Sequence, residues 1–310
     1  MKKIYQLLAH YVCFELKATY MMYVLLFLFP AIALNYYFDF ESSIVDSFKG
    51  QPVYFFLCFV YYAVPLYYAV TVYIVLFDKR QLLQDKKFLF VLFLFPCIMA
   101  FEQAFNLQKQ WVSGIENEYL RYYAKRTLNH TVRFLTYFLP IALYYIFLER
   151  ENKNFYGLAF SKVDIKPYLF MMFVIMMPLI IAVSFTKDFQ ASYPIYSMSN
   201  MKDQLPGAYW QQVAVFESQY LLDFVNIELM FRGCMIHVLY TYMGVECVLA
   251  VATVYCTFHF GKPMLETISS FVGGTVLGIL SLRTQSLYGG IFIHMGIAFM
   301  MEAASFAQQL

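Results

Sequence analysis

Four ionisable side chains in the last third of the sequence stand inside strongly apolar segments. Glu228 and Arg232 lie four residues apart, and His259 and His294 follow in later apolar runs. Ionisable groups are costly at membrane depth, so by default they mark functional sites. A carboxylate and two histidines can hold a water and take its proton, and an arginine four residues after a glutamate is well spaced to pair with it on a helix. The pattern predicts a buried hydrolytic site at Glu228, His259 and His294, with Arg232 beside it.

The composition predicts a multi-pass membrane protein. Hydrophobic residues make up 61% of the chain and charged residues 14%, against about 25% charged in ordinary soluble domains. Spanning helices need about 20 mostly apolar residues. That rule predicts eight or nine spans, near residues 18–37, 53–77, 87–106, 133–149, 167–185, 215–240, 244–260, 264–282 and 288–307. We therefore expect an all-α bundle of transmembrane helices that lies in the lipid bilayer.

The spans fall into two groups along the chain. Residues 1–150 are predicted to form N-terminal transmembrane helices, with a mixed-charge and aromatic segment at 107–132 that could lie on the membrane surface. Residues 151–310 are predicted to form a second helical core. The net charge of +2, without a run rich in lysine and arginine, argues against a nucleic-acid partner. The six cysteines are scattered with no CxxC pair, which is typical of small buried hydrophobic residues.

The order of motifs in this second core resembles the CPBP family of intramembrane endopeptidases, which includes CAAX proteases, bacteriocin-processing enzymes and Abi-type proteins. The family pattern is EExxxR, then FxxxH, then HxxxN or HxxxD. The matching positions here are Ile227, Glu228 and Arg232, then Tyr255 and His259, then His294 and Ala298. The resemblance covers about residues 154–302. It implies a C-terminal helical protease core, as in family members of the bacterial plasma (inner) membrane.

The resemblance also implies an activity, the hydrolysis of peptide bonds in a membrane-anchored protein or peptide. In the family the first glutamate and the two histidines activate water, the second glutamate pairs with the arginine, and the final asparagine assists at the oxyanion. This chain has Ile227 in place of the first glutamate and Ala298 in place of the asparagine. Loss of a general base typically costs about 10²–10⁴-fold in rate. Loss of an oxyanion donor costs about 10²–10³-fold.

Two other carboxylates stand near the altered positions. Asp223 lies one helical turn before Ile227, and Glu302 lies eight residues after His294. Either could approach the histidines, and Asp223 could instead orient substrate or support the structure, as could Arg232 and Tyr255.

A zinc ion or another divalent metal is an alternative way to activate the water. Catalytic zinc takes three protein ligands. His259 and His294 would supply two of them, and Glu228 or Asp223 the third.

Small residues at four-residue steps (Ser270, Gly274 and Gly278) are predicted to let the helix between the two histidines pack closely against its neighbours. Such packing would bring the flanking helices, and the residues of the predicted site, together.

Two further functions stay open on the sequence. Ile227 and Ala298 are also compatible with a catalytically impaired protein of the same fold that binds or scaffolds a membrane protein partner. Intramembrane glutamate and histidine also occur in proton-coupled transporters. That class is less favoured, because the sequence has neither repeats nor pairs of interrupted helices.

Overall fold

The computed structural model describes residues 2–151, 154–158, 164–196 and 199–308, and every regular element within these ranges is a helix. The chain divides into two compact units that are interleaved in sequence. Unit 1 contains Met1–Ala104, Tyr145–Ser161 and Leu229–Leu287, and unit 2 contains Phe105–Tyr144, Lys162–Glu228 and Tyr288–Leu310. The compact units therefore cut across the predicted boundary at residue 150, and a functional division at that point stays a prediction.

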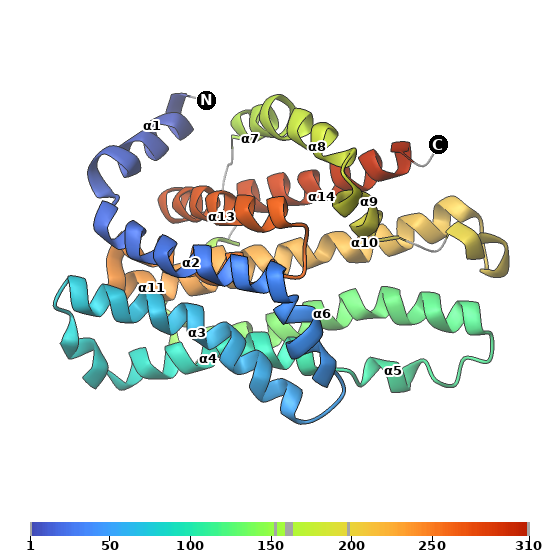
Figure 1. Cartoon of the computed structure of the whole chain (residues 1–310), viewed down its shortest axis with the longest axis horizontal. Coiled ribbons are helices and arrows are strands. Elements are labelled where there is room, and N and C mark those ends of the chain that lie inside the picture. Colours follow the sequence, from blue (N-terminus) through green and yellow to red (C-terminus); the bar gives the residue numbers. More distant parts are fainter. Residues whose placement is uncertain (1, 152–153, 159–163, 197–198, 309–310) are drawn as a thin grey trace. The chain divides into compact units, whose positions relative to one another are not determined.

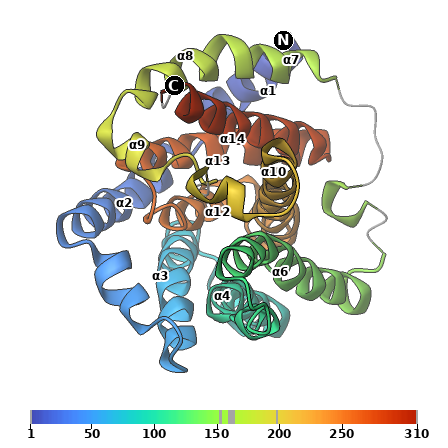
Figure 2. The same cartoon turned by 90° about the vertical axis from the view of Figure 1, so that its right-hand side faces the viewer.

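Unit 1 is built mainly from long apolar helices. Its principal elements are α1 (Lys2–His10), α2 (Ala18–Phe38), α3 (Val53–Leu76), α4 (Lys86–Ala104), η8 (Glu228–Met235, from Leu229 onward), α11 (Ile236–Met243), α12 (Cys247–Thr257) and α13 (Met264–Thr284). Helices α3 and α4 run side by side, as Figure 1 and Figure 2 both show.

Helix α12 forms the centre of unit 1. Every one of its residues is buried, and it packs against α2, α3 and α13. Its two threonine hydroxyls are satisfied within the helix, because Thr253 donates to the carbonyl of Leu249 and Thr257 donates to that of Thr253. A helix that is apolar on all sides is buried or membrane-spanning. The turn that follows α12 carries His259.

Unit 2 contains the helices around Glu228 and His294. They are α5 (Gln108–Trp111), α6 (Glu118–Leu148, to Tyr144), α7 (Lys166–Phe170), η6 (Met171–Met176), α8 (Met177–Ser184), α9 (Lys187–Ser192), η7 (Ser199–Gln204), α10 (Tyr209–Ile227) and α14 (Tyr288–Gln308). Helix α10 packs along α14, and the two can be followed in Figure 2. Glu228 directly follows α10, and His294 lies in α14.

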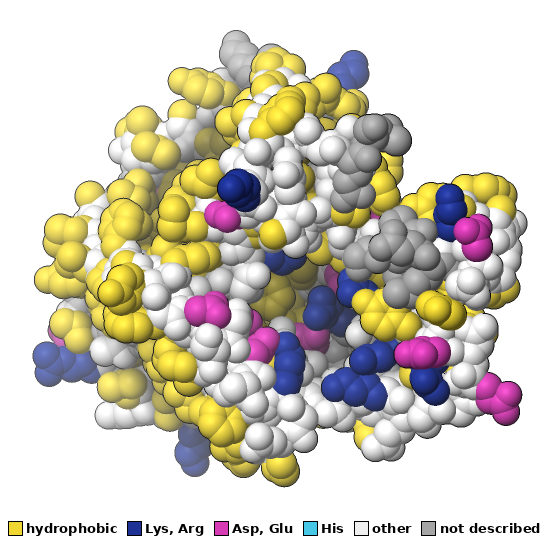
Figure 3. Space-filling view, turned by 45° about the vertical axis from the view of Figure 1, so that its right-hand side comes forward, with side chains coloured by type: hydrophobic (Ala, Val, Ile, Leu, Met, Phe, Trp, Pro, Cys, Tyr) yellow, Lys and Arg dark blue, Asp and Glu magenta, His cyan; other side chains and the backbone are white. Residues whose placement is uncertain are grey.

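Eight helical stretches in the described part of the chain are long and apolar enough to cross a membrane. One of them, Tyr209–Thr257, has 49 residues, more than twice the roughly 20 that a span needs. It covers the span predicted at 215–240 and most of the one predicted at 244–260, and it turns at Gly244, whose φ is 61°. Hydrophobic side chains cover much of the face drawn in Figure 3. The predicted all-α transmembrane bundle is confirmed, and the chain is an integral membrane protein.

Part of the segment predicted to lie on the membrane surface belongs to a long helix that continues into the next predicted span. Residues from Glu118 onward belong to α6, which continues without a break into the predicted span at 133–149. The reason is a polar face on α6 that packs against α10. Tyr123 donates to the backbone carbonyl of Gln212, and Thr131 donates to the side chain of Gln219.

Candidate active site

The buried Glu228 and the half-buried His294 form a hydrogen-bonded pair in unit 2. The Nδ1 atom of His294 lies 3.1 Å from Oε1 of Glu228, and the two side chains are 13% and 1% exposed. The ring of Phe224 covers one side of the imidazole, with 4.6 Å between ring centroids. A carboxylate only accepts hydrogen bonds, so its bond to His294 needs the proton on Nδ1. In the neutral ring, Nε2 then keeps a lone pair that can accept a proton.

A glycine of α14 allows the carboxylate to reach this position. A Cβ atom added to Gly290 would lie 2.4 Å from Oε2 of Glu228, which is closer than real Cβ contacts come. The backbone of α14 at Gly290 is therefore in direct contact with the carboxylate. A residue without a side chain at this point lets α14 bring His294 to Glu228.

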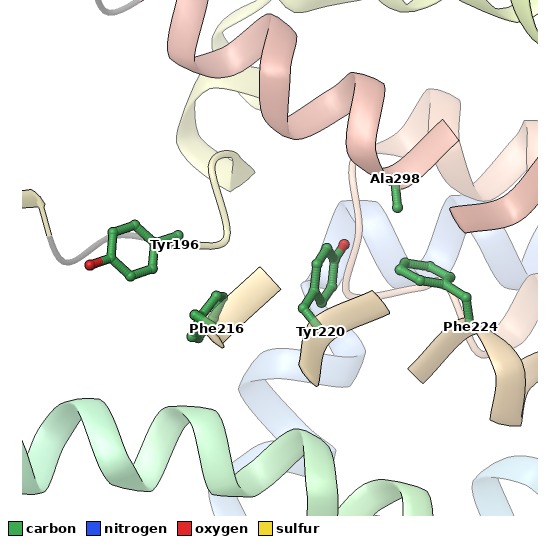
Figure 4. Packing of buried hydrophobic residues seen from close by; sticks show 5 residues of the cluster. All are labelled: Tyr196, Phe216, Tyr220, Phe224 and Ala298. Carbon is green, nitrogen blue, oxygen red and sulfur yellow. The ribbon is translucent and has the colours of Figure 1, made fainter. Parts of the chain in front are cut away.

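The two altered motif positions lie in one apolar cluster of unit 2. Ala298 is buried with Tyr220 and Phe224, and Ile227 packs against the same group. Figure 4 shows the rings of Tyr220 and Phe224 extending from α10 toward the helix that carries Ala298. Polar groups buried in such surroundings are costly unless they form hydrogen bonds. Ile227 and Ala298 therefore suit each other, as two apolar residues filling one packed region.

Asp223 has partners that the sequence did not suggest. Its Oδ2 atom lies 2.7 Å from Nδ1 of His130 and 3.2 Å from Nη1 of Arg133, both on α6. Asp223 is 3% exposed, and the rings of Phe216 and Tyr220 pack against the imidazole of His130. The arrangement supports a structural role for Asp223, as a link between α10 and α6, over a role as substitute for the missing glutamate.

Glu302, the other candidate substitute, is also engaged elsewhere. Both of its oxygens accept from the backbone N–H of Ile195, at 2.8 and 3.1 Å. Its carboxyl also faces Glu217 of α10. Glu302 therefore ties α14 to the loop before α10, some eight residues beyond His294 along α14.

Arg232, Tyr255 and His259 are placed together in unit 1. The guanidinium carbon of Arg232 lies 3.8 Å from the ring centroid of Tyr255, a close cation–π contact. The Nδ1 atom of His259 lies 2.9 Å from the carbonyl oxygen of Tyr255, one turn earlier on α12. Tyr255 thus holds both the arginine and the histidine, the first through its ring and the second through its backbone.

Helix α13 covers this group through its small residues, as the sequence predicted. A Cβ atom on Gly274 would lie 2.9 Å from Cδ1 of Tyr255 and 3.6 Å from Nη2 of Arg232. On Gly278 it would lie 2.8 Å from Cδ1 of Ile236. Ser281 of the same helix donates to the backbone carbonyl of Arg232. Convergence of His259 with Glu228 and His294, and the pairing of Glu228 with Arg232, stay predictions from the sequence.

The side chains predicted to bind a metal do not form a complete set of ligands in the described part of the chain. In the described part of the chain, no three histidine, cysteine, aspartate or glutamate side chains come together as metal ligands would. Glu228 and His294 alone fall short of the three ligands that catalytic zinc takes. A zinc site that also takes His259 of unit 1 as a ligand stays a prediction from the sequence.

His130 and Arg133 are the site-region residues that sequence reasoning missed. Their partner Asp223 is about 90 residues away in sequence, so no short motif connects them. One signal was available, because His130 is one of only five histidines in the chain and lies in a long helix that becomes strongly apolar.

Fold and site together define a helical membrane protein in which a buried carboxylate forms a hydrogen bond with a histidine. Residues 209–300 match the family model described as type II CAAX prenyl endopeptidase Rce1-like. The matched segment contains Glu228, Arg232, His259 and His294, so the resemblance to CAAX proteases is confirmed, and the chain is a CAAX protease-like membrane protein. No curated protein and no solved structure matches the chain.

Proposed function

We propose that the chain is an intramembrane endopeptidase that hydrolyses a peptide bond in a membrane-anchored protein or peptide. The observation that carries the proposal is the hydrogen-bonded pair of the buried Glu228 and the half-buried His294, 3.1 Å apart, inside the segment that matches the CAAX endopeptidase family. A histidine oriented by a carboxylate is a common general base. For a bacterial chain, helical spans would place this reaction in the plasma (inner) membrane, because outer-membrane spans are β-barrels.

The reaction uses Nε2, the second nitrogen of the His294 imidazole. Nε2 of His294 takes a proton from a water molecule while the water oxygen bonds to the peptide carbonyl carbon. The carbon–nitrogen bond then breaks, and the same proton passes to the leaving amine. Glu228 holds the ring in the tautomer with Nδ1 protonated and stabilises the imidazolium that forms. His259 enters this proposal only as the second histidine that the motif order predicts.

The test uses two peptide probes, because the natural substrate is not identified. One probe is a peptide ending in a farnesylated Cys-aliphatic-aliphatic-X box, and the other is the same peptide on a transmembrane anchor without the prenyl group. We expect cleavage of at least one probe by the purified protein in nanodiscs. His294→Ala should lower the rate by about 10²–10⁴-fold, as expected for loss of a general base.

The matched control is His237→Ala. His237 is also a half-buried helical histidine, but its Nδ1 bonds to backbone carbonyls of its own helix. Equal cleavage by the wild type and His294→Ala would overturn the proposal, whereas a loss in His237→Ala of the same size would point to misfolding.

A second candidate function is supported by the apolar cluster around Ile227 and Ala298. Two positions that would carry polar catalytic groups are filled by hydrophobic packing. On this alternative the protein binds or scaffolds a membrane protein partner and cleaves nothing. It predicts that His294→Ala complements a deletion strain as well as the wild-type protein does. It also predicts that a partner co-purifies with both proteins.

A further inference from the structure

The turn that carries His259 is held by side chains from α2, a helix outside the matched segment. Asn35 is 4% exposed, and its Nδ2 donates to the carbonyl of Phe260 at 3.0 Å. The Oδ1 of Asn35 accepts from the backbone N–H of Glu41 at 3.0 Å, which fixes the orientation of the amide. The hydroxyl of Tyr36 donates to the carbonyl of Lys262 at 2.6 Å. Two consecutive residues of α2 therefore bind the carbonyls on either side of Gly261.

The carbonyls nearest to His259 are held in the same way. The hydroxyl of Thr267, which also lies 2.6 Å from the hydroxyl of Tyr36, donates to the carbonyl of His259 itself. Tyr61 of α3 donates to the carbonyl of Thr257 at 3.1 Å. All of these residues belong to unit 1.

These bonds fix a loop that backbone hydrogen bonds alone leave weakly held. The turn ends α12 through short-range bonds, including His259 N–H to the carbonyl of Cys256 and Lys262 N–H to that of His259. The carbonyls at a helix end need outside partners, and in a membrane such partners must come from the protein. Asn35, Tyr36 and Tyr61 supply them from outside residues 209–300.

We propose that Asn35, Tyr36 and Thr267 are positioning residues for the imidazole of His259. His259 is 9% exposed, and its Nδ1 bonds to the carbonyl of Tyr255, so the backbone of this turn sets where Nε2 points. Helix α2 then contributes positioning residues to the proposed active site, although the family match begins only at residue 209. The proposal rests on the proposed function only in assigning His259 a part in the reaction.

The test compares hydroxyl deletions in the full-length protein in nanodiscs. Tyr36→Phe removes the bond to Lys262, and Thr267→Val removes the bond to His259. The matched control is Tyr20→Phe, which removes a buried tyrosine hydroxyl from the same helix, where it donates to the carbonyl of Ala69 at 3.2 Å. Thr267→Ser keeps the hydroxyl and should restore the wild-type result.

Two readouts are measured on each variant. The first is the ring resonances and titration midpoint of His259 in ¹³C-histidine-labelled protein, assigned among the five histidines with His259→Gln. The second is the cleavage rate of the two peptide probes. We expect Tyr36→Phe and Thr267→Val to shift the His259 resonances and to lower the rate about 10–100-fold, the scale of a displacement near 1 Å. Tyr20→Phe and Thr267→Ser should leave both readouts unchanged.

Unmoved His259 resonances in Tyr36→Phe and Thr267→Val would overturn the proposal. If Tyr36→Phe does not fold, the pair Thr267→Val and Thr267→Ser decides the question. The magnetic resonance readout needs no cleavage, so the two proposals fail separately. Shifted resonances in a protein that cleaves neither probe would support the positioning role and count against the endopeptidase.

Discussion

At the residue scale, the contact between Glu228 and Gly290 makes the hydrogen-bonded pair of Glu228 and His294 sensitive to a single methyl group. A Cβ atom on Gly290 would lie 2.4 Å from the carboxylate oxygen, so Gly290→Ala must displace Glu228 or push α14 away. We expect either change to lengthen the bond between Glu228 and His294. We expect Gly290→Ala to lower probe cleavage at least tenfold and to shift the His294 ring resonances.

The control for this substitution is Gly273→Ala on α13. A Cβ atom on Gly273 meets nothing within 4 Å. Alanine is favoured over glycine inside helices by about 0.5–1 kcal/mol, so this variant should be as stable as the wild type or slightly more so. Unchanged His294 resonances in Gly290→Ala would contradict the direct contact of Glu228 with the α14 backbone.

A second residue-scale prediction concerns the position that lacks the motif glutamate. Ile227→Glu places a carboxyl against the apolar cluster of Phe224, Tyr220 and Ala298. Burying a polar group without a hydrogen-bond partner costs about 1–3 kcal/mol in protein mutants. We expect a lower unfolding midpoint for Ile227→Glu and no gain in probe cleavage. Faster cleavage without loss of stability would show instead that this position still opens into a hydrolytic site.

Some of these residues could be found from the sequence and others could not, for a physical reason. Glu228 and His294 stand out because ionisable groups are rare and costly in apolar segments. Asn35 and Tyr36 do not stand out, because a neutral amide or phenol is common in a chain with 28 tyrosines. Their role depends on carbonyls some 225 residues away, a pairing that only the fold reveals.

At the element scale, close packing of α13 makes its buried glycines intolerant of added volume. A Cβ atom on Gly274 would lie 2.9 Å from the ring of Tyr255, which carries the guanidinium of Arg232. Overpacking a well-packed interior typically costs about 1–3 kcal/mol. We expect Gly274→Ala to lower the unfolding free energy by that amount in a denaturation series, with the neighbouring Gly273→Ala as control. Equal unfolding free energies for the two variants would contradict the close contact between Gly274 of α13 and the ring of Tyr255.

Hydropathy predicts the positions of the membrane helices better than the points at which they begin. Runs of about 20 apolar residues located the membrane helices well, because the length of a span follows from bilayer thickness. The start of α6 at Glu118 was missed, since its first turns are polar and bind α10 through Tyr123 and Thr131. A polar helix face looks the same in the sequence whether it packs against another helix or lies at a membrane surface. Composition and periodicity alone therefore do not distinguish the two settings.

At the scale of the whole molecule, the interleaving of the units predicts that the C-terminal half does not fold alone. Helix α12 is buried along its full length, and α2 and α3 supply part of its cover. A chain beginning at residue 151 would expose that surface and lose the bonds from Asn35 and Tyr36 to the His259 turn. We expect this fragment to aggregate or be degraded. Co-expression of residues 1–150 on a second chain should restore a soluble, monodisperse complex by size-exclusion chromatography in detergent.

A monodisperse fragment 151–310 that unfolds cooperatively would contradict this expectation. It would show that residues 151–310 are a self-sufficient domain, as the division at residue 150 predicted from the sequence supposes.

The two acids near the end of α10 also bear on how the chain is assembled in the membrane. Asp223 finds His130 and Arg133 on a helix made earlier, whereas the histidine partner of Glu228 lies 66 residues later. At 5–20 residues per second, ribosomes need about 3–13 s to reach it. A charged residue at the centre of a span costs about 2.5–3.5 kcal/mol on insertion scales. We therefore expect α6 to be the first docking partner of α10 during synthesis, because α14 and the histidine partner of Glu228 are made later.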